Sequence, residues 1–359
     1  MGDVPASPAW ASLPPFPDHL TTAPLVTLHL SKLQEHDPAE QAALLKCAKE
    51  LGFFYLNLTG CTEGKQLFSD AQQLLDLEKR FFAMPDEEKA ICDRDTVEGG
   101  SGYYGWKKIG SAVMDSKGTP ERHENYTIKK DDIVGNCTPL AAPQLIKDNF
   151  PLLRSFVLNA QKQGILMLQL LNESLQLPPG SLENMHRLHA LSGDHVRFIR
   201  APARGEGNSD QTAAEHTDFG SLTILFNWLG GLQVQLPGSK EWVYVRPIPG
   251  CAIINLGDAM VKFSGGLLRS NMHRVLNPPG KQANETRYSL VYFSRPEDDV
   301  VMRRLEGGLV EQQPKSDVVE PEYTSKEWIL RRGLGPKTSG FKPENWINSR
   351  GTEGARSTV

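Results

Sequence analysis

The sequence lacks two features that would define its class directly. Within its 359 residues, no stretch approaches the roughly 18 consecutive apolar residues that a membrane-spanning helix needs. Its formal net charge is −4, so it offers no broad basic surface for nucleic acid. We therefore expect neither a membrane nor a nucleic acid as a partner.

Cysteine is scarce, and its spacing is irregular. The five cysteines form an odd number and include no Cys-x-x-Cys pair, which argues against a disulfide framework or a zinc ribbon. This usage fits a reducing compartment. The first twenty residues carry an early acid and many prolines, and they lack the basic start and apolar core of a signal peptide. We expect a cytoplasmic protein.

The first half of the chain has mainly helical patterns. Apolar residues recur at helical spacing over 38–52, 64–82 and 143–177, and "FFYLNL" at 53–58 is typical of a strand. The apolar stripe of the long pattern at 143–177 is expected to pack on a sheet. Residues 93–140, with "GGSGYYGWKKIGS", are predicted to form irregular loops that can line a site.

From residue 195 to residue 296 the pattern changes to short β-rich runs separated by Gly, Pro and Asn. The runs are "HVRFIRA", "SLTILFNW", "LQVQL", "WVYVRPI", "CAIINLG" and "RYSLVYFS". No helices alternate with them, so a β-sandwich or jelly roll is favoured over a parallel sheet. We predict a mixed α+β protein with an α/β region at 1–140, a helical support at 141–190, a jelly-roll core at 191–300, and a C-terminal helix and tail at 301–359.

Residues that suit a metal lie inside the β-rich half. His216 and Asp218 are two apart and face the same side if they lie on an extended segment. His273 follows after 54 intervening residues, 219–272, a gap long enough to wind around a barrel and return. Two histidines and one carboxylate on one face leave coordination positions open, which suits Fe(II) that must bind oxygen and an organic ligand together.

Other histidines compete for this role. His195 is a rival third ligand. His186 and His189 form another possible pair, but their segment "LENMHRLHALSG" favours solvent-exposed histidines. By itself, a His-x-Asp…His pattern is weak evidence for a metal site.

A second cluster follows His273. In "RYSLVYF", Arg287 and Ser289 share one face of the predicted strand. A guanidinium group with a neighbouring hydroxyl is a good receptor for a carboxylate, because arginine offers two parallel charged donors. The alternative is a surface arginine in a salt bridge.

Over most of its length, the chain resembles the Fe(II)/2-oxoglutarate-dependent oxygenases of the isopenicillin N synthase-like superfamily. In the first half the resemblance rests on "CAKELGFFYLNLTG" and "RFFAMPDEEKA". In the second half it rests on "EHTDFGSLTILF", "GGLQVQLPGSKEWVYVRPIPGCAIINLGDAM", "SNMHRVLNPP" and "RYSLVYFSRP". The resemblance implies a double-stranded β-helix, or jelly roll, with helices packed outside. It makes residues 1–140 an N-terminal region of the non-haem dioxygenase type.

The resemblance also implies roles for these residues. His216, Asp218 and His273 would hold Fe(II), while Arg287 and Ser289 would bind the distal carboxylate of 2-oxoglutarate. Asn255 and Asp258, in "NLGD", match a structural element. One departure concerns the tyrosine with which many relatives help hold 2-oxoglutarate: Ala201 stands at that position, and Arg197 or Arg200 is a candidate to compensate.

The implied reaction consumes 2-oxoglutarate and O2, releases succinate and CO2, and oxidises a small organic molecule through a ferryl species. Hydroxylation, desaturation and ring rearrangement all remain open, as do the substrate and the oligomeric state. Two alternatives to this function are an iron oxidase of the same fold that does not use 2-oxoglutarate, and a non-catalytic jelly-roll binding protein.

The substrate is expected at the open mouth of the barrel. Lys107, Lys108 and Arg122 are interpreted as solvated surface charges rather than substrate contacts. The candidate pocket walls are aromatic: Tyr103, Tyr104, Trp106, Phe226 and Trp328.

Overall fold

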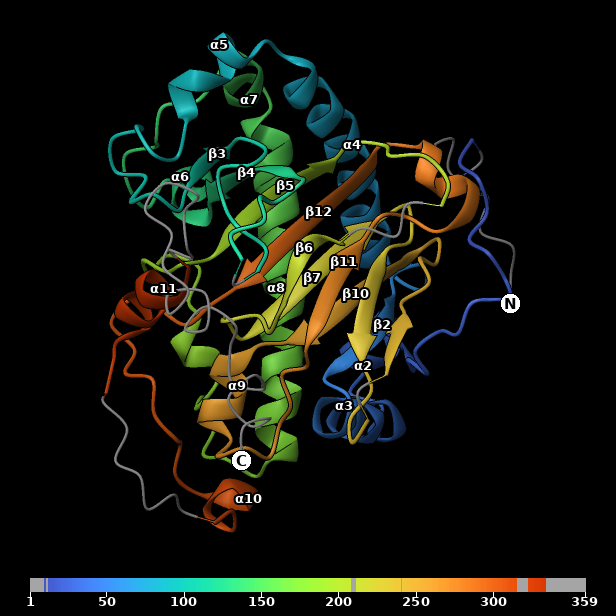
Figure 1. Ribbon diagram of the computed structural model, residues 1–359. Coiled ribbons are helices and arrows are strands. Elements are labelled where there is room, and N and C mark those ends of the chain that lie inside the picture. The colour runs from blue at the N-terminus through green and yellow to red at the C-terminus, as the bar shows by residue number, and fades with distance from the viewer. Residues whose placement is uncertain are drawn as a thin grey trace.

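Two antiparallel-rich sheets face each other in the computed structural model, and helices cover the outside of the larger one (Figure 1). The structure describes residues 10, 12–115, 117–207, 211–239, 241–314 and 322–333. The larger sheet has the strand order β1-β2-β10-β7-β12-β5-β4-β3, and the smaller one the order β6-β11-β8-β9. The strands are β1 Thr27–His29, β2 Phe53–Asn57, β3 Gly105–Lys107, β4 Glu124–Lys129, β5 His195–Ala201, β6 Gln211–His216, β7 Leu222–Asn227, β8 Leu232–Gln235, β9 Trp242–Tyr244, β10 Cys251–Leu256, β11 His273–Leu276 and β12 Arg287–Ser294.

The chain crosses repeatedly between the two sheets. After β5 in the larger sheet it enters β6 in the smaller one, returns to β7, and then passes through β8 and β9, β10, β11 and β12 with a change of sheet at each step. The inward faces of both sheets therefore meet around one interior.

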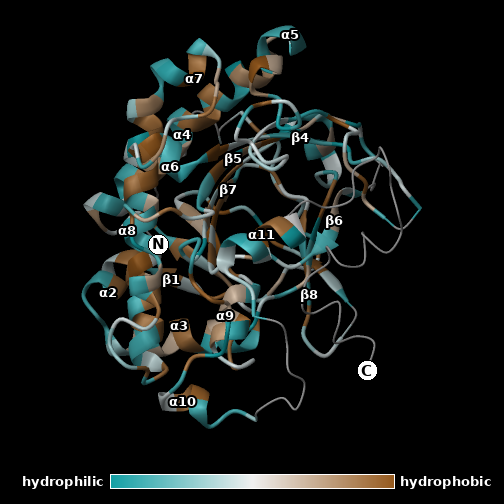
Figure 2. Ribbon diagram, turned by 90° about the vertical axis from the view of Figure 1, so that its left-hand side faces the viewer, coloured by the Kyte–Doolittle hydropathy of each residue, from teal (hydrophilic) through white to brown (hydrophobic). Residues whose placement is uncertain are grey.

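Helices form one layer against the outer face of the larger sheet, as Figure 2 shows for α2, α3, α4 and α8. α8 carries the apolar stripe predicted at 143–177, and its Phe156 ring contacts Phe226 of β7 at 6.0 Å between centroids. The stripe therefore packs on the sheet as expected. The helices are α2 Leu30–Gln34, α3 Pro38–Glu50, α4 Thr62–Ala83, α5 Asp86–Lys89, α6 Lys130–Val134, α7 Gln144–Asp148, α8 Phe150–Ser174, α9 Asp258–Phe263, α10 Gly308–Glu311 and α11 Ser325–Gly333, with single 3-10 turns at Ala90–Cys92, Glu183–Met185 and Gly280–Asn284.

Local sequence accounts for where α3 begins and ends. Asp37 accepts a hydrogen bond from the Glu40 backbone at 2.9 Å, and Pro38 occupies the first turn, where no amide donor is needed. Gly52 adopts a φ of +70°, and a Cβ there would lie 2.2 Å from the Arg269 carbonyl oxygen. Only glycine fits this close turn, which leads the chain directly into β2.

The structure corrects the expectation of irregular loops throughout 93–140. Residues 124–129 form β4, which pairs with β5 along its whole length, and 105–107 form β3 beside it. The reason is tertiary: the segment "ENYTIK" completes its backbone hydrogen bonds with β5, which outweighs its weak local strand pattern. The predicted boundaries at residues 140, 190 and 300 stay predictions, and strands from both sides of residues 140 and 190 share one sheet. The predicted tail beyond residue 333 lies outside the described residues.

None of the helices in the described part of the chain has the length and apolar character needed to cross a membrane.

Candidate active site

His216, Asp218 and His273 come together at the rim between the two sheets. One ligand atom from each lies within 4.8 Å of the others. The Nε2 atoms of both histidines lie 3.7 Å from Oδ1 of Asp218. His216 ends β6, His273 begins β11, and the two are Cα partners in the smaller sheet. Asp218 lies in the following segment, where the chain crosses to β7 in the larger sheet.

The outer atoms of these side chains already have partners, so the inner atoms are left to face one another. Nδ1 of His216 donates to the Ala214 carbonyl at 2.7 Å, and Nδ1 of His273 donates to the Asn271 carbonyl at 3.1 Å. Because a carbonyl can only accept a hydrogen bond, these bonds place the proton on Nδ1. The Nε2 atom of each ring therefore keeps a free lone pair.

Asp218 is held in the same way. Its Oδ2 accepts from Asn255 at 2.7 Å and from Thr223 at 2.6 Å, so Oδ1 alone faces the two histidines. A backbone hydrogen bond also holds this segment in place, because the N–H of Asp258 donates to the Asp218 carbonyl at 2.8 Å. A Cβ at Gly257 would lie 2.2 Å from the Gly220 carbonyl oxygen, so glycine permits this close approach.

Electrostatics favour a neutral histidine next to an ionised carboxylate. Burial, followed by the charge of His216, lowers the pKa of His273 to about 4. Burial alone would raise the pKa of Asp218. The two histidines and the hydrogen bonds from Asn255 and Thr223 outweigh burial and bring that pKa below its usual range.

Two sequence expectations about this cluster need correction. The strand β6 ends at His216, so Asp218 lies two residues beyond it, in the segment that leads to β7. His186 is buried rather than exposed, with Nε2 bonded to the Ser221 hydroxyl at 2.7 Å and Nδ1 to the Leu182 carbonyl. His189 is exposed as expected. His195 packs on Phe293 and lies outside the cluster.

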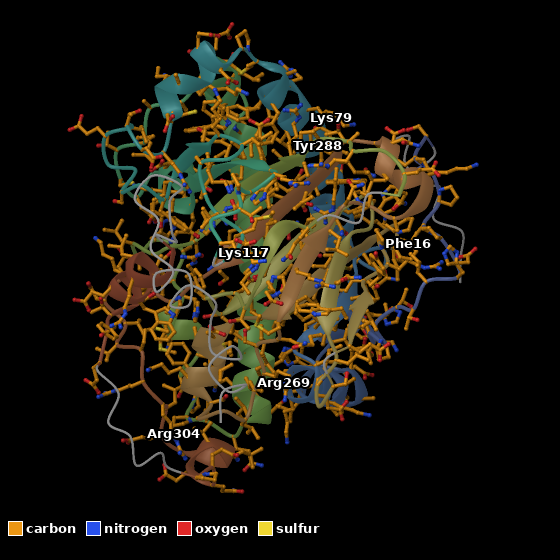
Figure 3. All side chains as sticks on the ribbon, in the orientation of Figure 1. Phe16, Lys79, Lys117, Arg269, Tyr288 and Arg304 are labelled. Atoms are coloured by element: carbon orange, nitrogen blue, oxygen red, sulfur yellow. The ribbon has the colours of Figure 1, made fainter. Side chains whose placement is uncertain are left out.

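Arg287 and Ser289 lie on one face of β12, as their spacing predicted. Arg287 is 4 % exposed and donates from Nη1 to the Ser289 hydroxyl at 2.6 Å and from Nε to the Gly230 carbonyl at 2.8 Å. Burial lowers its pKa to about 10, and the nearby Glu78 opposes that change. Tyr288, between them, faces the other side of the sheet, where it packs against the core on the side of α4 (Figure 3).

A cavity of about 290 Å³ connects these groups. The three clustered residues, Arg287, Ser289 and Ala201 all line it. Of the aromatic residues predicted as its walls, Tyr103 lines it too. The other four are not among its lining residues: Tyr104 packs on His195 and Tyr103, Trp106 donates to Glu124, Phe226 contacts Phe156, and Trp328 donates to the Phe219 carbonyl.

Sequence reasoning missed a group of charged residues in this cavity. Lys107, interpreted as a surface charge, is buried and forms an ion pair with Glu121, and its Nζ lies 3.1 Å from Nε2 of His123. Lys108 is exposed and pairs with Asp86, as a surface charge would.

Arg197 and Arg295 line the cavity as well. Strand alternation could have found both arginines, because residues an even number apart on a strand share a face. Arg295, directly after β12, is eight residues from Arg287, and Arg197 is four residues from Ala201 on β5. Arg200, on the opposite face, pairs with Glu124 instead.

Two family models match the chain. One describes the 2OG-Fe(II) oxygenase superfamily and matches residues 193–296; the other describes the N-terminal region of non-haem dioxygenases in morphine synthesis and matches residues 23–148. A 2-oxoglutarate-dependent dioxygenase of Aspergillus fumigatus is 30% identical over 94% of this chain and 90% of its own length. The chain belongs to the 2OG-Fe(II) oxygenase superfamily.

A further relative agrees with this assignment, and a solved structure shares the fold. The 2-oxoglutarate-dependent dioxygenase gloE of Glarea lozoyensis is 30% identical over 80% of this chain and 84% of its own. The crystal structure of a full-length Neurospora crassa protein in complex with alpha-KG superposes with a TM-score of 0.70 at 21% identity, covering 86% of this chain and 94% of that one. This likeness confirms the predicted fold class, a jelly-roll core with flanking helices.

The oxygenase is therefore an enzyme that uses Fe(II), 2-oxoglutarate and O2 to oxidise a small molecule, as the sequence predicted. The names of its relatives favour this function over the two alternatives, an iron oxidase that does not use 2-oxoglutarate and a binding protein without catalysis.

Proposed function

We propose that His216, Asp218 and His273 hold the Fe(II) ion of this oxygenase and that Arg287 with Ser289 binds the distal carboxylate of 2-oxoglutarate. The observation that carries the proposal is the convergence of three ligand atoms within 4.8 Å. Two imidazole nitrogens and one carboxylate oxygen suit Fe(II) and leave positions open for co-substrates. With 2-oxoglutarate and O2, the metal supplies the oxidation of an unactivated carbon and the release of succinate and CO2.

The protein's own contribution is to hold its ligands in one arrangement before the metal binds. The backbone carbonyls of Ala214 and Asn271 fix both imidazole rings with Nε2 inward. Thr223 and Asn255 occupy the outer oxygen of Asp218, so the carboxylate can bind through one oxygen only. Such outer contacts orient ligands and raise metal affinity.

Arg287 provides the charge that the second carboxylate of 2-oxoglutarate needs. Its contacts with Gly230 and Ser289 fix the guanidinium plane, and its burial strengthens any interaction with an anion. Ala201, opposite Arg287 on β5, offers no hydroxyl here. Among the candidates to replace the tyrosine, Arg200 pairs with Glu124, and Arg197 pairs with Val291, four residues along β12 from Arg287. We therefore assign the anchor to Arg287 and Ser289.

Whether the product arises by hydroxylation, desaturation or ring rearrangement depends on which carbon the cavity presents. A cytoplasmic location is also part of the proposal, because all five cysteines are free thiols, which persist in a reducing compartment.

The test measures Fe(II)-dependent succinate formation from 2-oxoglutarate and Fe(II) binding by the same samples. We expect His216→Ala and His273→Ala to lose both, because two ligands hold the metal weakly. His189→Ala, at an exposed histidine, is the matched control and should behave as the wild type. Full iron binding and turnover in either ligand variant would refute the assignment.

A further inference from the structure

A second cationic cluster lies in the cavity, separate from Arg287. Arg197 and Arg295 both donate to the hydroxyl oxygen of Tyr103, at 2.8 Å and 2.6 Å. Both guanidinium groups also lie over the Tyr103 ring, 5.3 Å and 5.2 Å from its centroid. All three residues line the cavity, and we call them the Tyr103 cluster.

The two arginines of the Tyr103 cluster have no carboxylate partner in the described part of the chain. Arg295 is 2 % exposed, and its Nε and Nη1 atoms make no hydrogen bond there. Arg197 uses Nε for Thr127 and Nη2 for Tyr103, which leaves Nη1 for a ligand. A buried cation without a counter-charge is costly, so this arrangement suits a site that an anion completes.

The carboxylates that line the cavity are engaged elsewhere. Glu121 forms an ion pair with Lys107, and Asp218 belongs to the proposed metal site. The charge of Glu215 acts to raise the pKa of Arg274. The Lys107–Glu121 pair is thus balanced, whereas the Tyr103 cluster keeps two positive charges.

Neighbouring groups respond to this excess charge. Burial raises the pKa of the Tyr103 phenol, but Arg197 and Arg295 outweigh it and hold the pKa below its usual range. Burial, then Arg295 and Arg197, lower the pKa of His195 well below its usual range. The potential around Tyr103 is therefore positive, which would raise the affinity for an anion.

The two arginines of the Tyr103 cluster lie farther along the two paired strands than Arg287. Arg287 and Arg295 are eight residues apart along β12 and its extension, which corresponds to about 27 Å of extended backbone. Arg197 pairs with Val291, four residues from Arg287. If Arg287 anchors 2-oxoglutarate, the Tyr103 cluster remains for the second organic molecule.

Between the two ends the wall is partly apolar. Val291 and Phe293 follow Ser289 on the same face of β12, and Phe219 lines the cavity beside the proposed metal site. The volume of about 290 Å³ is at the lower limit of small-molecule sites, which span roughly 300–1,000 Å³. It must also hold 2-oxoglutarate, which leaves room for a small substrate only.

We propose that the substrate is a small organic acid whose carboxylate binds at Arg197, Arg295 and Tyr103 while its apolar part lies over Val291 and Phe293 towards the metal site. This inference rests on the proposed function, because it assigns the substrate to the space that 2-oxoglutarate leaves. The planar guanidinium groups match a carboxylate, and a phosphate monoester is the alternative anion.

The test measures binding of small acids to the enzyme loaded with Fe(II) and 2-oxoglutarate without oxygen. Hexanoate, phenylacetate and benzoate are compared with their neutral amides, and phenyl phosphate with phenol. We expect at least one acid to bind about tenfold more tightly than its amide, as one charge-assisted hydrogen bond would give. Arg197→Gln and Arg295→Gln should each remove this preference.

Arg200→Gln is the matched control, since Arg200 lies on the same strand but faces away and pairs with Glu124. It should keep the preference for the acid. The inference is overturned if no carboxylic acid binds more tightly than its amide, if only phenyl phosphate is preferred, or if all three variants behave alike. The visible absorption band of the Fe(II)–2-oxoglutarate complex is recorded in every sample. If the wild type shows this band but no preference for an acid, only the present inference is overturned. If the wild type shows no band, the result counts against the proposed function.

Discussion

The two cationic ends of the cavity differ in how their charge is arranged. At one end, Arg287 is fixed by Gly230 and Ser289 and lies near the buried Glu78, whose pKa burial raises well above its ordinary value. At the other end, the guanidinium groups of Arg197 and Arg295 both donate to the hydroxyl of Tyr103. The first end suits one co-substrate that every turnover requires, and the second keeps its charge for the molecule that is oxidised.

A further contrast lies within the second end. Lys107, Glu121 and His123 form a network in which the cation has its counter-charge, while the arginines beside it have none. Burial together with the charge of Lys107 lowers the pKa of His123 to about 4, so this histidine is neutral and the network carries no net charge. Removing one partner of a buried ion pair destabilises the fold, whereas buried cations without a counter-charge indicate a ligand site.

Removing Lys107 is the strongest way to test that contrast. Lys107→Met leaves the carboxylate of Glu121 buried without its partner and is expected to lower the free energy of unfolding by about 3 kcal/mol. Arg197→Met leaves no charge unpaired and should cost much less. Chemical denaturation of both variants measures the difference, and equal losses would show that the two sets of cations are not distinct.

Arg287→Gln tests the co-substrate end. Loss of the buried charge should weaken the apparent affinity for 2-oxoglutarate about a hundredfold, because the carboxylate then lacks its charged donor. Arg197→Gln serves as the comparison and should change the KM for the organic substrate instead. If the two variants affect 2-oxoglutarate equally, the division of the cavity into two ends is wrong.

Thr223→Val gives the smallest expected effect and concerns the metal site between the ends. The substitution keeps the shape but removes the 2.6 Å hydrogen bond to the outer oxygen of Asp218. We expect about a tenfold loss of Fe(II) affinity with unchanged folding. Isothermal titration under anaerobic conditions measures it, and unaltered affinity would mean that Asn255 alone orients the carboxylate.

Much of the core could be predicted because its strands carry strong local patterns. "HVRFIRA" and "RYSLVYFS" coincide with β5 and β12 at every residue, and the pattern at 38–52 became α3. The strands β4 and β6 were not predicted, because β4 is short and lies in a segment rich in glycine and charged residues, and the sequence "QTAAEH" of β6 has no run of strand-forming residues. What stabilises them is pairing with distant strands, which a local pattern does not contain.

For the candidate site too, some residues could be predicted from the sequence and others could not. His216, Asp218, His273, Arg287 and Ser289 could be found from spacing and family resemblance, and the structure brings the first three together. The contacts of Asn255 and Thr223 with Asp218 could not be predicted, because these residues lie on separate strands. Strand alternation could place Arg197 and Arg295 on the cavity side, but it could not show that both donate to Tyr103. Of the aromatic residues expected as cavity walls, Tyr103 lines the cavity, whereas Trp106 donates to Glu124, a contact with a distant strand that the local sequence does not contain.

The most direct test of the central claim is the visible absorption spectrum of the apoprotein after anaerobic addition of Fe(II) and then 2-oxoglutarate. The proposed site predicts a metal-to-ligand charge-transfer band in the wild type that is lost in Asp218→Ala and needs far more 2-oxoglutarate in Arg287→Gln. A wild-type protein that binds Fe(II) at these three residues but develops no band with 2-oxoglutarate would contradict it.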